Sequence, residues 1–67
     1  MPQGVVKFYN MIKGFGFITA ENGDEIFFHK SSVKSTGFRD TLVKGDTVKF
    51  ELKQDQKGKR AYNIIRT

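Results

Sequence analysis

Apolar and polar residues alternate over short stretches of this chain, the pattern expected of β-strands that bury one face. These stretches are rich in β-branched and aromatic residues, which favour strands, and turn residues separate them. The predicted strands cover residues 5–10, 15–20, 25–29, 47–53 and 61–65. No segment has a sustained helical period. Five short strands with tight turns predict an all-β fold, a small closed or partly closed barrel.

Turn residues indicate how the strands are connected. Asn22-Gly23 fits the two positive-φ positions of a tight hairpin turn, so strands 15–20 and 25–29 should be antiparallel neighbours. Further turns are expected at Lys44-Gly45-Asp46 and at residues 56–59. The long connection that follows the third strand begins with Ser31-Ser32-Val33, which we expect to form a single helical turn.

Alternation divides the side chains of the second and third strands between two faces. The purely apolar set, Ile18, Ile26 and Phe28, is the natural core face. The opposite face combines rings with polar groups and carries Phe15, Phe17, Glu25, Phe27 and His29. Burying a carboxylate and an imidazole without partners costs several kcal/mol, so we expect this mixed face to lie outside the barrel.

An aromatic stripe at strand spacing is most often part of a core, and that alternative stays open for these rings. Three details favour exposure, the first being that the opposite face already has a complete apolar set. Second, Gly14 and Gly16 flank Phe15, and glycine within a strand marks the close approach of a ligand or of another backbone. Third, basic residues adjoin the stripe in sequence, namely Lys7, Lys13 and Lys30. An exposed aromatic patch indicates a ligand.

Charge narrows the class of that ligand. Twelve Lys and Arg against seven Asp and Glu give a net charge of +5, which favours polyanions. The chain also has seven Phe among its 67 residues. Rings beside cations suit a single-stranded nucleic acid, because each base offers a π-face and each phosphate a negative charge.

Length and composition exclude several other classes. A chain of 67 residues is expected to form one domain, residues 1–67, and without cysteine it has no disulfide and no thiolate to hold a metal. No apolar run approaches the roughly 20 residues of a membrane span, and the first residues lack the regions of a signal peptide. We therefore expect a cytoplasmic protein that begins at Met1, does not associate with membranes and has no cofactor.

Two motifs give the chain a family resemblance. Lys13-Gly-Phe-Gly-Phe-Ile18 resembles the first ribonucleoprotein motif of bacterial cold-shock proteins, and Ile26-Phe-Phe-His-Lys-Ser31 resembles the second. Residues 4–10, 37–39 and 61–63 resemble the opening strand, the central loop and the closing strand of that family. The resemblance covers essentially the whole chain.

The resemblance implies a five-stranded antiparallel OB-fold barrel that binds single-stranded RNA and single-stranded DNA. It also implies an RNA chaperone of the stress response, tolerant of sequence, with a preference for pyrimidine-rich runs. A monomer is expected, and a domain-swapped dimer stays open. By motif position, the binding surface would comprise Lys7, Phe8, Asn10, Lys13, Phe15, Phe17, Phe27, His29 and Phe38. The residues implied to stack on bases are Phe15, Phe17, Phe27 and His29.

Three positions depart from the usual family pattern. Phe8 stands where tryptophan is common, so stacking there would use a smaller ring. Lys30 stands where an aromatic residue is common, which exchanges a stacking platform for a charge that attracts phosphate. The last hairpin turn is strongly basic through Lys53, Lys57, Lys59 and Arg60. Lys57 and Arg60 are therefore added to the predicted contacts, although a merely solvated turn is the alternative.

Two arguments disagree about the face on which Phe8 lies. Strict alternation puts Phe8 on the same face as Val6, which looks like a core residue, whereas the resemblance places Phe8 outside. A β-bulge in the first strand would reconcile them.

Two other functions have weaker support in the sequence. His29 is the only histidine, and a catalytic base needs an orienting partner and usually a nucleophile, so we expect no enzyme. A protein- or saccharide-interaction module could use the same aromatic face, because small barrels serve many functions. The interleaved lysines argue against that alternative.

Overall fold

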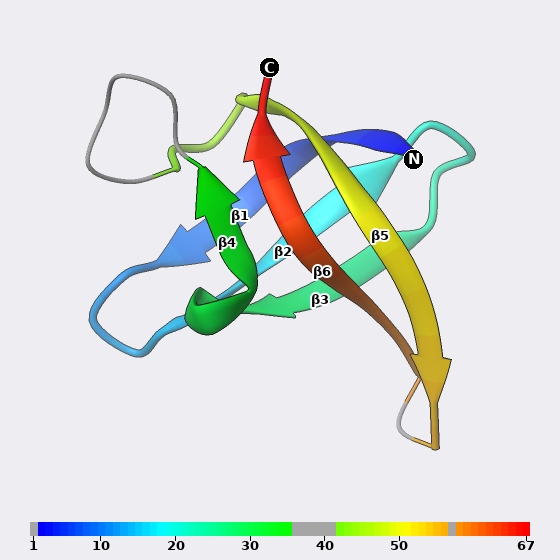
Figure 1. Ribbon diagram of the computed structural model, residues 1–67. Coiled ribbons are helices and arrows are strands. Elements are labelled where there is room, and N and C mark those ends of the chain that lie inside the picture. The colour runs from blue at the N-terminus through cyan, green and yellow to red at the C-terminus, as the bar shows by residue number, and fades with distance from the viewer. Residues whose placement is uncertain (1, 36–41, 57) are drawn as a thin grey trace.

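The computed structural model describes residues 2–35, 42–56 and 58–67, most of which lie in strands (Figure 1). The strands are β1 (Gln3–Asn10), β2 (Phe15–Ala20), β3 (Glu25–His29), β4 (Val33–Ser35), β5 (Thr47–Asp55) and β6 (Gly58–Arg66). A 3-10 turn, η1 (Lys30–Ser32), lies between β3 and β4, one residue earlier than the predicted helical turn. The predicted bounds of β2 and β3 are confirmed, whereas β1, β5 and β6 are longer than predicted.

Five of these strands close into a barrel. The sheet order is β3-β2-β1-β5-β6-β4, and an additional pairing of β3 with β6 closes it. The pairs β1–β2, β2–β3, β1–β5 and β5–β6 are antiparallel, while the closing contact, Phe27 beside Arg60, is parallel. Figure 1 shows β5 and β6 crossing in front of the other strands, with their connected ends reaching beyond the barrel. The predicted OB-fold barrel is confirmed, and the short β4 adds to it along β6.

The apolar interior holds the barrel together. Its fully buried side chains, each at most 2% exposed, are Val6, Ile18, Ile26, Phe28, Leu42, Val48, Phe50, Ala61 and Ile64. The predicted core face of β2 and β3 is therefore confirmed. Burial of one large apolar side chain contributes about 1.5–3 kcal/mol, so these residues supply the main stabilising term. Tyr9 packs against this core with its ring centre 5.4 Å from that of Phe28.

A β-bulge in β1 settles the position of Phe8. Val6 pairs with Ile18 on β2, but the next partner, Phe17, pairs with Phe8, so Lys7 is the extra residue. The bulge turns Phe8 outward beside Phe17 while Val6 stays buried. It also returns the following residue, Tyr9, to the inner face. The conflict between alternation and resemblance is thus resolved in favour of an exposed Phe8.

A second bulge lies in β6. Lys49 pairs with Ile65 and Glu51 pairs with Tyr62, so a single β5 residue faces two residues of β6. One of those two, Asn63, has a positive φ of 51°, which asparagine tolerates better than most residues. The bulge keeps both Ala61 and Ile64 buried although they are three positions apart, and it turns the two residues between them outward.

The β2–β3 turn differs from its prediction. Ala20 N donates to the carbonyl of Asp24 at 2.8 Å, which encloses three loop residues rather than two. Gly23 has a φ of 91°, but Asn22 does not have a positive φ. The Asn22 side chain instead accepts a hydrogen bond from Asp24 N at 3.1 Å. This arrangement corresponds to a three-residue hairpin loop with glycine in the left-handed position, and the antiparallel pairing of β2 and β3 is unaffected.

Candidate nucleic-acid interface

Four phenylalanines gather on the outside of β1, β2 and β3. Ring centres are 5.8 Å apart for Phe8 and Phe15, 6.0 Å for Phe15 and Phe27, and 5.7 Å for Phe17 and Phe27. Phe15 and Phe27 are nearly parallel at 19°, whereas Phe17 stands edge-on to both neighbours. We call Phe8, Phe15, Phe17 and Phe27 the aromatic patch.

The aromatic patch is separate from the core. Phe8 is 43% exposed and the other three rings are half-buried, whereas every core ring is fully covered. The alternative that these rings only fill the interior is therefore wrong. Because each ring touches another, their orientations are held before any ligand arrives. Ring faces in this arrangement suit flat, apolar groups such as nucleobases.

Asn10 builds the loop beside the patch. Its Oδ1 accepts hydrogen bonds from Ile12 N at 3.0 Å and Lys13 N at 2.9 Å, and its carbonyl accepts from Gly14 N at 2.8 Å. The loop is tied to the next hairpin because Lys30 N donates to the Gly14 carbonyl at 2.8 Å. Asn10 therefore positions Lys13 at the edge of the patch, and only its side-chain amide group is left to contact a ligand.

His29 has a structural role at the end of β3. Its Nδ1 accepts a hydrogen bond from Ser31 N at 3.1 Å and lies 2.9 Å from Ser31 Oγ. This contact caps the turn η1 and fixes the ring orientation. The imidazole itself is exposed, next to Phe15, its partner in the β2–β3 register. The geometry thus leaves the ring available beside the patch.

Cations surround the patch, and some already have partners. Lys7 forms an ion pair with Glu25, with both side chains more than half exposed. An exposed ion pair contributes at most about 1 kcal/mol, so a phosphate can replace the carboxylate at little cost. Lys13 and Lys30 are exposed and form no ion pair within the described parts of the chain.

Arg60 connects the patch with β6. Its guanidinium carbon lies 5.0 Å from the centre of the Phe27 ring, so the cation covers part of that ring. From the sequence, Arg60 was predicted as a contact only because it belongs to a basic turn. Nothing in the sequence indicated the parallel β3–β6 pairing that brings Arg60 against Phe27. Lys59, its neighbour, pairs instead with Asp24. The remaining predicted contacts, Phe38 and Lys57, lie outside the described residues.

One ring–cation pair next to Arg60 was not among the residues predicted from the sequence. Tyr62 faces outward two residues further along β6, and the Nζ of Lys53 lies 5.3 Å from the centre of its ring. The signal in the sequence was a lysine and a tyrosine in adjacent predicted strands, and the β5–β6 register that brings the two side chains together could not be inferred from alternation.

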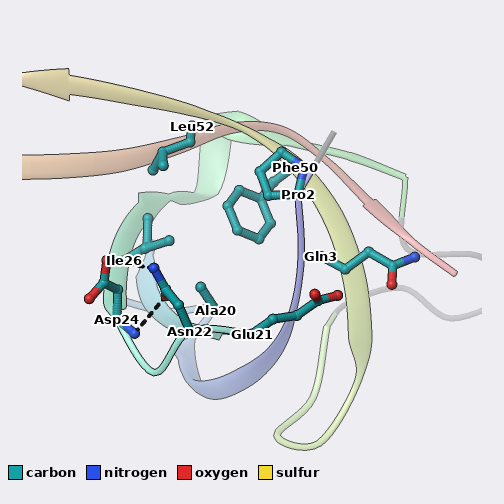
Figure 2. A pocket seen from close by; sticks show the side chains of 9 residues that line it. All are labelled: Pro2, Gln3, Ala20, Glu21, Asn22, Asp24, Ile26, Phe50 and Leu52. Carbon is teal, nitrogen blue, oxygen red and sulfur yellow. Dashed lines mark hydrogen bonds between the residues drawn. The ribbon is translucent and has the colours of Figure 1, made fainter.

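A small hollow lies away from the patch. It encloses about 190 Å³ between the N-terminal residues, the β2–β3 turn and β5, as Figure 2 shows. Phe50 and Ile26 lie beneath it, and Glu21 and Asp24 stand at its rim. None of the predicted site residues lines it. The hollow is therefore separate from the aromatic patch.

The part of the chain that the structure describes has no helix long and apolar enough to cross a membrane, and its acidic and histidine side chains are not gathered into a metal site.

Comparison with known proteins agrees with this geometry. Residues 2–67 match the family described as the 'Cold-shock' DNA-binding domain. The solved structure of Drosophila Unr CSD456 is similar, with a TM-score of 0.77 over 98% of this chain and 26% of that chain. At 24% sequence identity this similarity concerns the fold alone.

Bacterial relatives are more similar in sequence. The major cold shock protein of Streptococcus pyogenes is 46% identical over 98% of this chain and 97% of its own length. Cold shock protein CspC of Bacillus subtilis is 47% identical, covering 96% of each chain. Cold shock-like protein CspG of Shewanella violacea is 51% identical over 92% of this chain and 89% of its own. The match over residues 2–67 and these relatives together show that the chain belongs to the cold-shock domain family of nucleic-acid-binding proteins.

Proposed function

We propose that this protein binds single-stranded RNA and DNA on the aromatic patch, with little dependence on base sequence. The observation that carries the proposal is the exposed cluster of mutually packed rings with Lys13, Lys30 and Arg60 around it. Each stacked base contributes about 1–3 kcal/mol, and every base has a π-face, so stacking selects single strands without selecting a sequence.

The cations determine how binding depends on salt. Lys7, Lys13 and Lys30 surround the patch, and each phosphate neutralised lowers log K by about 0.7 per decade of salt for a single strand. A protein with a net charge of +5 should therefore bind much more weakly at high salt. The contacts assigned to Phe38 and Lys57 belong to the same proposal.

The proposed cellular role is that of an RNA chaperone. A surface that traps unpaired strand shifts the equilibrium of a weak hairpin toward its open form, because the ligand binds one state only. No step of this scheme requires ATP or catalysis. The proposal also holds that the protein is a cytoplasmic monomer and that it prefers pyrimidine-rich strands.

A binding titration tests the function directly. Anisotropy of a fluorescein-labelled oligothymidine is measured at low and at high salt, with a duplex of the same length as control. Tight, salt-dependent binding of the single strand and weak binding of the duplex are expected. Absence of single-strand binding at low salt overturns the proposal and favours a protein- or saccharide-interaction module.

A second assay tests the chaperone role. A hairpin oligonucleotide carrying a fluorophore and a quencher at its ends should brighten when the protein is added without ATP. If the protein binds oligothymidine but leaves a marginally stable hairpin closed at saturation, binding stands and the chaperone role is wrong.

A further inference from the structure

The outer face of the β5–β6 hairpin continues the aromatic patch around the barrel. Phe27 contacts Arg60, whose guanidinium carbon is 5.0 Å from the ring centre. Arg60 pairs directly with Lys53 on β5, and the Lys53 amine lies 5.3 Å from the ring centre of Tyr62. Two rings and two cations thus form a continuous series, from Phe27 on β3 through Arg60 on β6 and Lys53 on β5 to Tyr62 on β6.

Tyr62 lies on this outer face because it follows the buried Ala61 and pairs with Glu51 on β5. Ala61 and Ile64 are buried, so the two residues between them face outward together. Tyr62 is half-buried, which leaves part of its ring accessible, and Lys53 is exposed. The ring has no place in the core, and its described ring contact is with a cation rather than with another apolar side chain.

Charges on this face favour an anionic ligand. The described cations are Lys49, Lys53 and Arg60, and the described carboxylate is that of Glu51. Glu51 Oε2 accepts a hydrogen bond from Asn63 Nδ2 at 3.0 Å, so this carboxylate is engaged at the bulge. A nucleotide matches the arrangement, because its base can stack on Tyr62 while the Lys53 amine moves from the ring to the phosphate.

We propose that Tyr62 and Lys53 form an additional stacking position for single-stranded nucleic acid, which extends the binding site beyond Arg60 onto the β5–β6 hairpin. This inference rests on the proposed function of the aromatic patch. It assigns Tyr62 to base stacking and Lys53 to the phosphate of the same nucleotide. Short strands fill the patch alone, whereas longer strands also reach Tyr62.

The test is a series of labelled oligothymidines from about four to about sixteen nucleotides, the range of site sizes of OB-folds. For the shortest strand that wild type binds, Tyr62→Ala should have the same affinity as wild type. It should bind the longest strand about tenfold to a hundredfold more weakly than wild type, since it loses one stacked base. Tyr62→Phe keeps the ring and should retain wild-type affinity at every length.

Charge variants test the assignment of Lys53. Lys53→Gln should flatten the salt dependence for long strands but not for short ones. Lys49→Gln is the matched control, because Lys49 is an exposed lysine on the same strand and face without a ring contact; it should have the smaller effect. Equal effects of the two variants overturn the role of Lys53.

The possible results distinguish a failure of the Tyr62 position from a failure of single-strand binding on the aromatic patch. If Tyr62→Ala binds long strands as wild type does, the additional position is wrong and the aromatic patch is unaffected. If that variant weakens short and long strands equally while Tyr62→Phe does not, Tyr62 belongs to the patch or supports it, and the extension is again wrong. If wild type binds no strand of any length, the proposed function itself fails.

Discussion

Gly16 leaves the space that the ring of Phe28 occupies. A Cβ at Gly16 would lie 2.7 Å from Phe28 Cζ and 2.4 Å from the carbonyl oxygen of Phe8. The sequence indicated the close approach of a ligand or of another backbone at this glycine. The neighbour is the backbone of β1 together with a core ring, and the site face is not involved.

Gly16→Ala should therefore reduce stability without a direct effect on binding. Overpacking of this kind costs about 1–3 kcal/mol, because neither a strand carbonyl nor a fully buried ring can move freely. Chemical denaturation measures the loss. Ile12→Ala is the matched control, since the Ile12 side chain is 95% exposed, and it should change stability little. Equal stability of the Gly16 variant and wild type contradicts the packing argument.

Asp46 is expected to be the most sensitive charged position. Its side chain is only 8% exposed, and its Oδ2 accepts a hydrogen bond from Val43 N at 2.9 Å. Oδ1 lies 3.6 Å from Nε of Arg66, which provides a compensating charge. Asp46→Ala leaves the part-buried amide of Val43 without its acceptor, and such a loss costs about 1–3 kcal/mol when the amide is shielded from water. Asp46→Asn keeps an acceptor oxygen and should lose less; thermal or urea unfolding of both variants distinguishes the two effects.

The parts of the fold that depend only on residues close in sequence could be predicted. The bounds of β2 and β3 follow from period-two alternation on both sides of a glycine turn. Their two faces follow from the cost of burying Glu25 and His29, and the structure has Ile18, Ile26 and Phe28 inside. These inferences use neighbours in sequence, which is why they did not depend on the rest of the chain.

The parts that could not be predicted depend on tertiary pairing. Alternation cannot locate the bulges after Val6 and after Tyr62, because each inserts one residue in response to the partner strand. The parallel contact of Phe27 with Arg60 forms only when the barrel closes. The role of Asn10 in supporting its loop was missed for a related reason, since its acceptors become useful only once the loop folds back.

Stacking and charge should be separable by mutation. Phe17 packs against two other rings of the patch and has no charge, so Phe17→Ala should weaken oligothymidine binding by about 1–3 kcal/mol with an unchanged salt slope. Phe27→Ala should do the same, with the added loss of the contact between the Phe27 ring and Arg60. Titrations at several salt concentrations give both the affinity and the slope. Wild-type affinity in both variants contradicts the stacking mechanism.

Lys13→Ala should change the salt dependence of binding and leave the stacking contribution unchanged. Lys13 is held at the edge of the patch by the Asn10 contact to its backbone, and its exposed side chain is free to approach a phosphate. Loss of one phosphate contact reduces the slope of log K against log salt by about 0.7. At high salt the variant and wild type should converge. A constant ratio of affinities at all salt concentrations indicates that Lys13 contacts a base instead.

Low pH should weaken the ion pair between Asp24 in the β2–β3 turn and Lys59 on β6. The hydrogen bond and the charge of Lys59, with a smaller contribution from the Asn22 hydrogen bond, lower the pKa of Asp24 below its ordinary value. A carboxyl whose pKa is lower in the folded protein contributes stability above its unfolded pKa and loses it as pH falls through the folded pKa. Part of the acid destabilisation below about pH 4 should therefore disappear in Asp24→Asn.

Urea denaturation at neutral and at acidic pH measures this contribution. Glu21→Gln serves as control, because it removes a carboxylate from the same turn and leaves the Asp24–Lys59 pair intact. The pair is exposed, so the difference should be small and should shrink in high salt. Identical pH profiles for Asp24→Asn and wild type at low salt contradict a role for the pair in folding.

Asn63 should tolerate glycine but not a β-branched residue. Its φ of 51° is in the left-handed region, which costs an ordinary L-residue about 1–2 kcal/mol and glycine almost nothing. Both variants lose the hydrogen bond to Glu51, and in urea denaturation Asn63→Val should lose about 1–2 kcal/mol more than Asn63→Gly. Because Asn63 directly follows Tyr62, a backbone shift at the bulge also displaces Tyr62, so Asn63→Val should weaken binding of long oligothymidines more than Asn63→Gly does. Equal stability of the two variants would mean that β6 can form without the bulge.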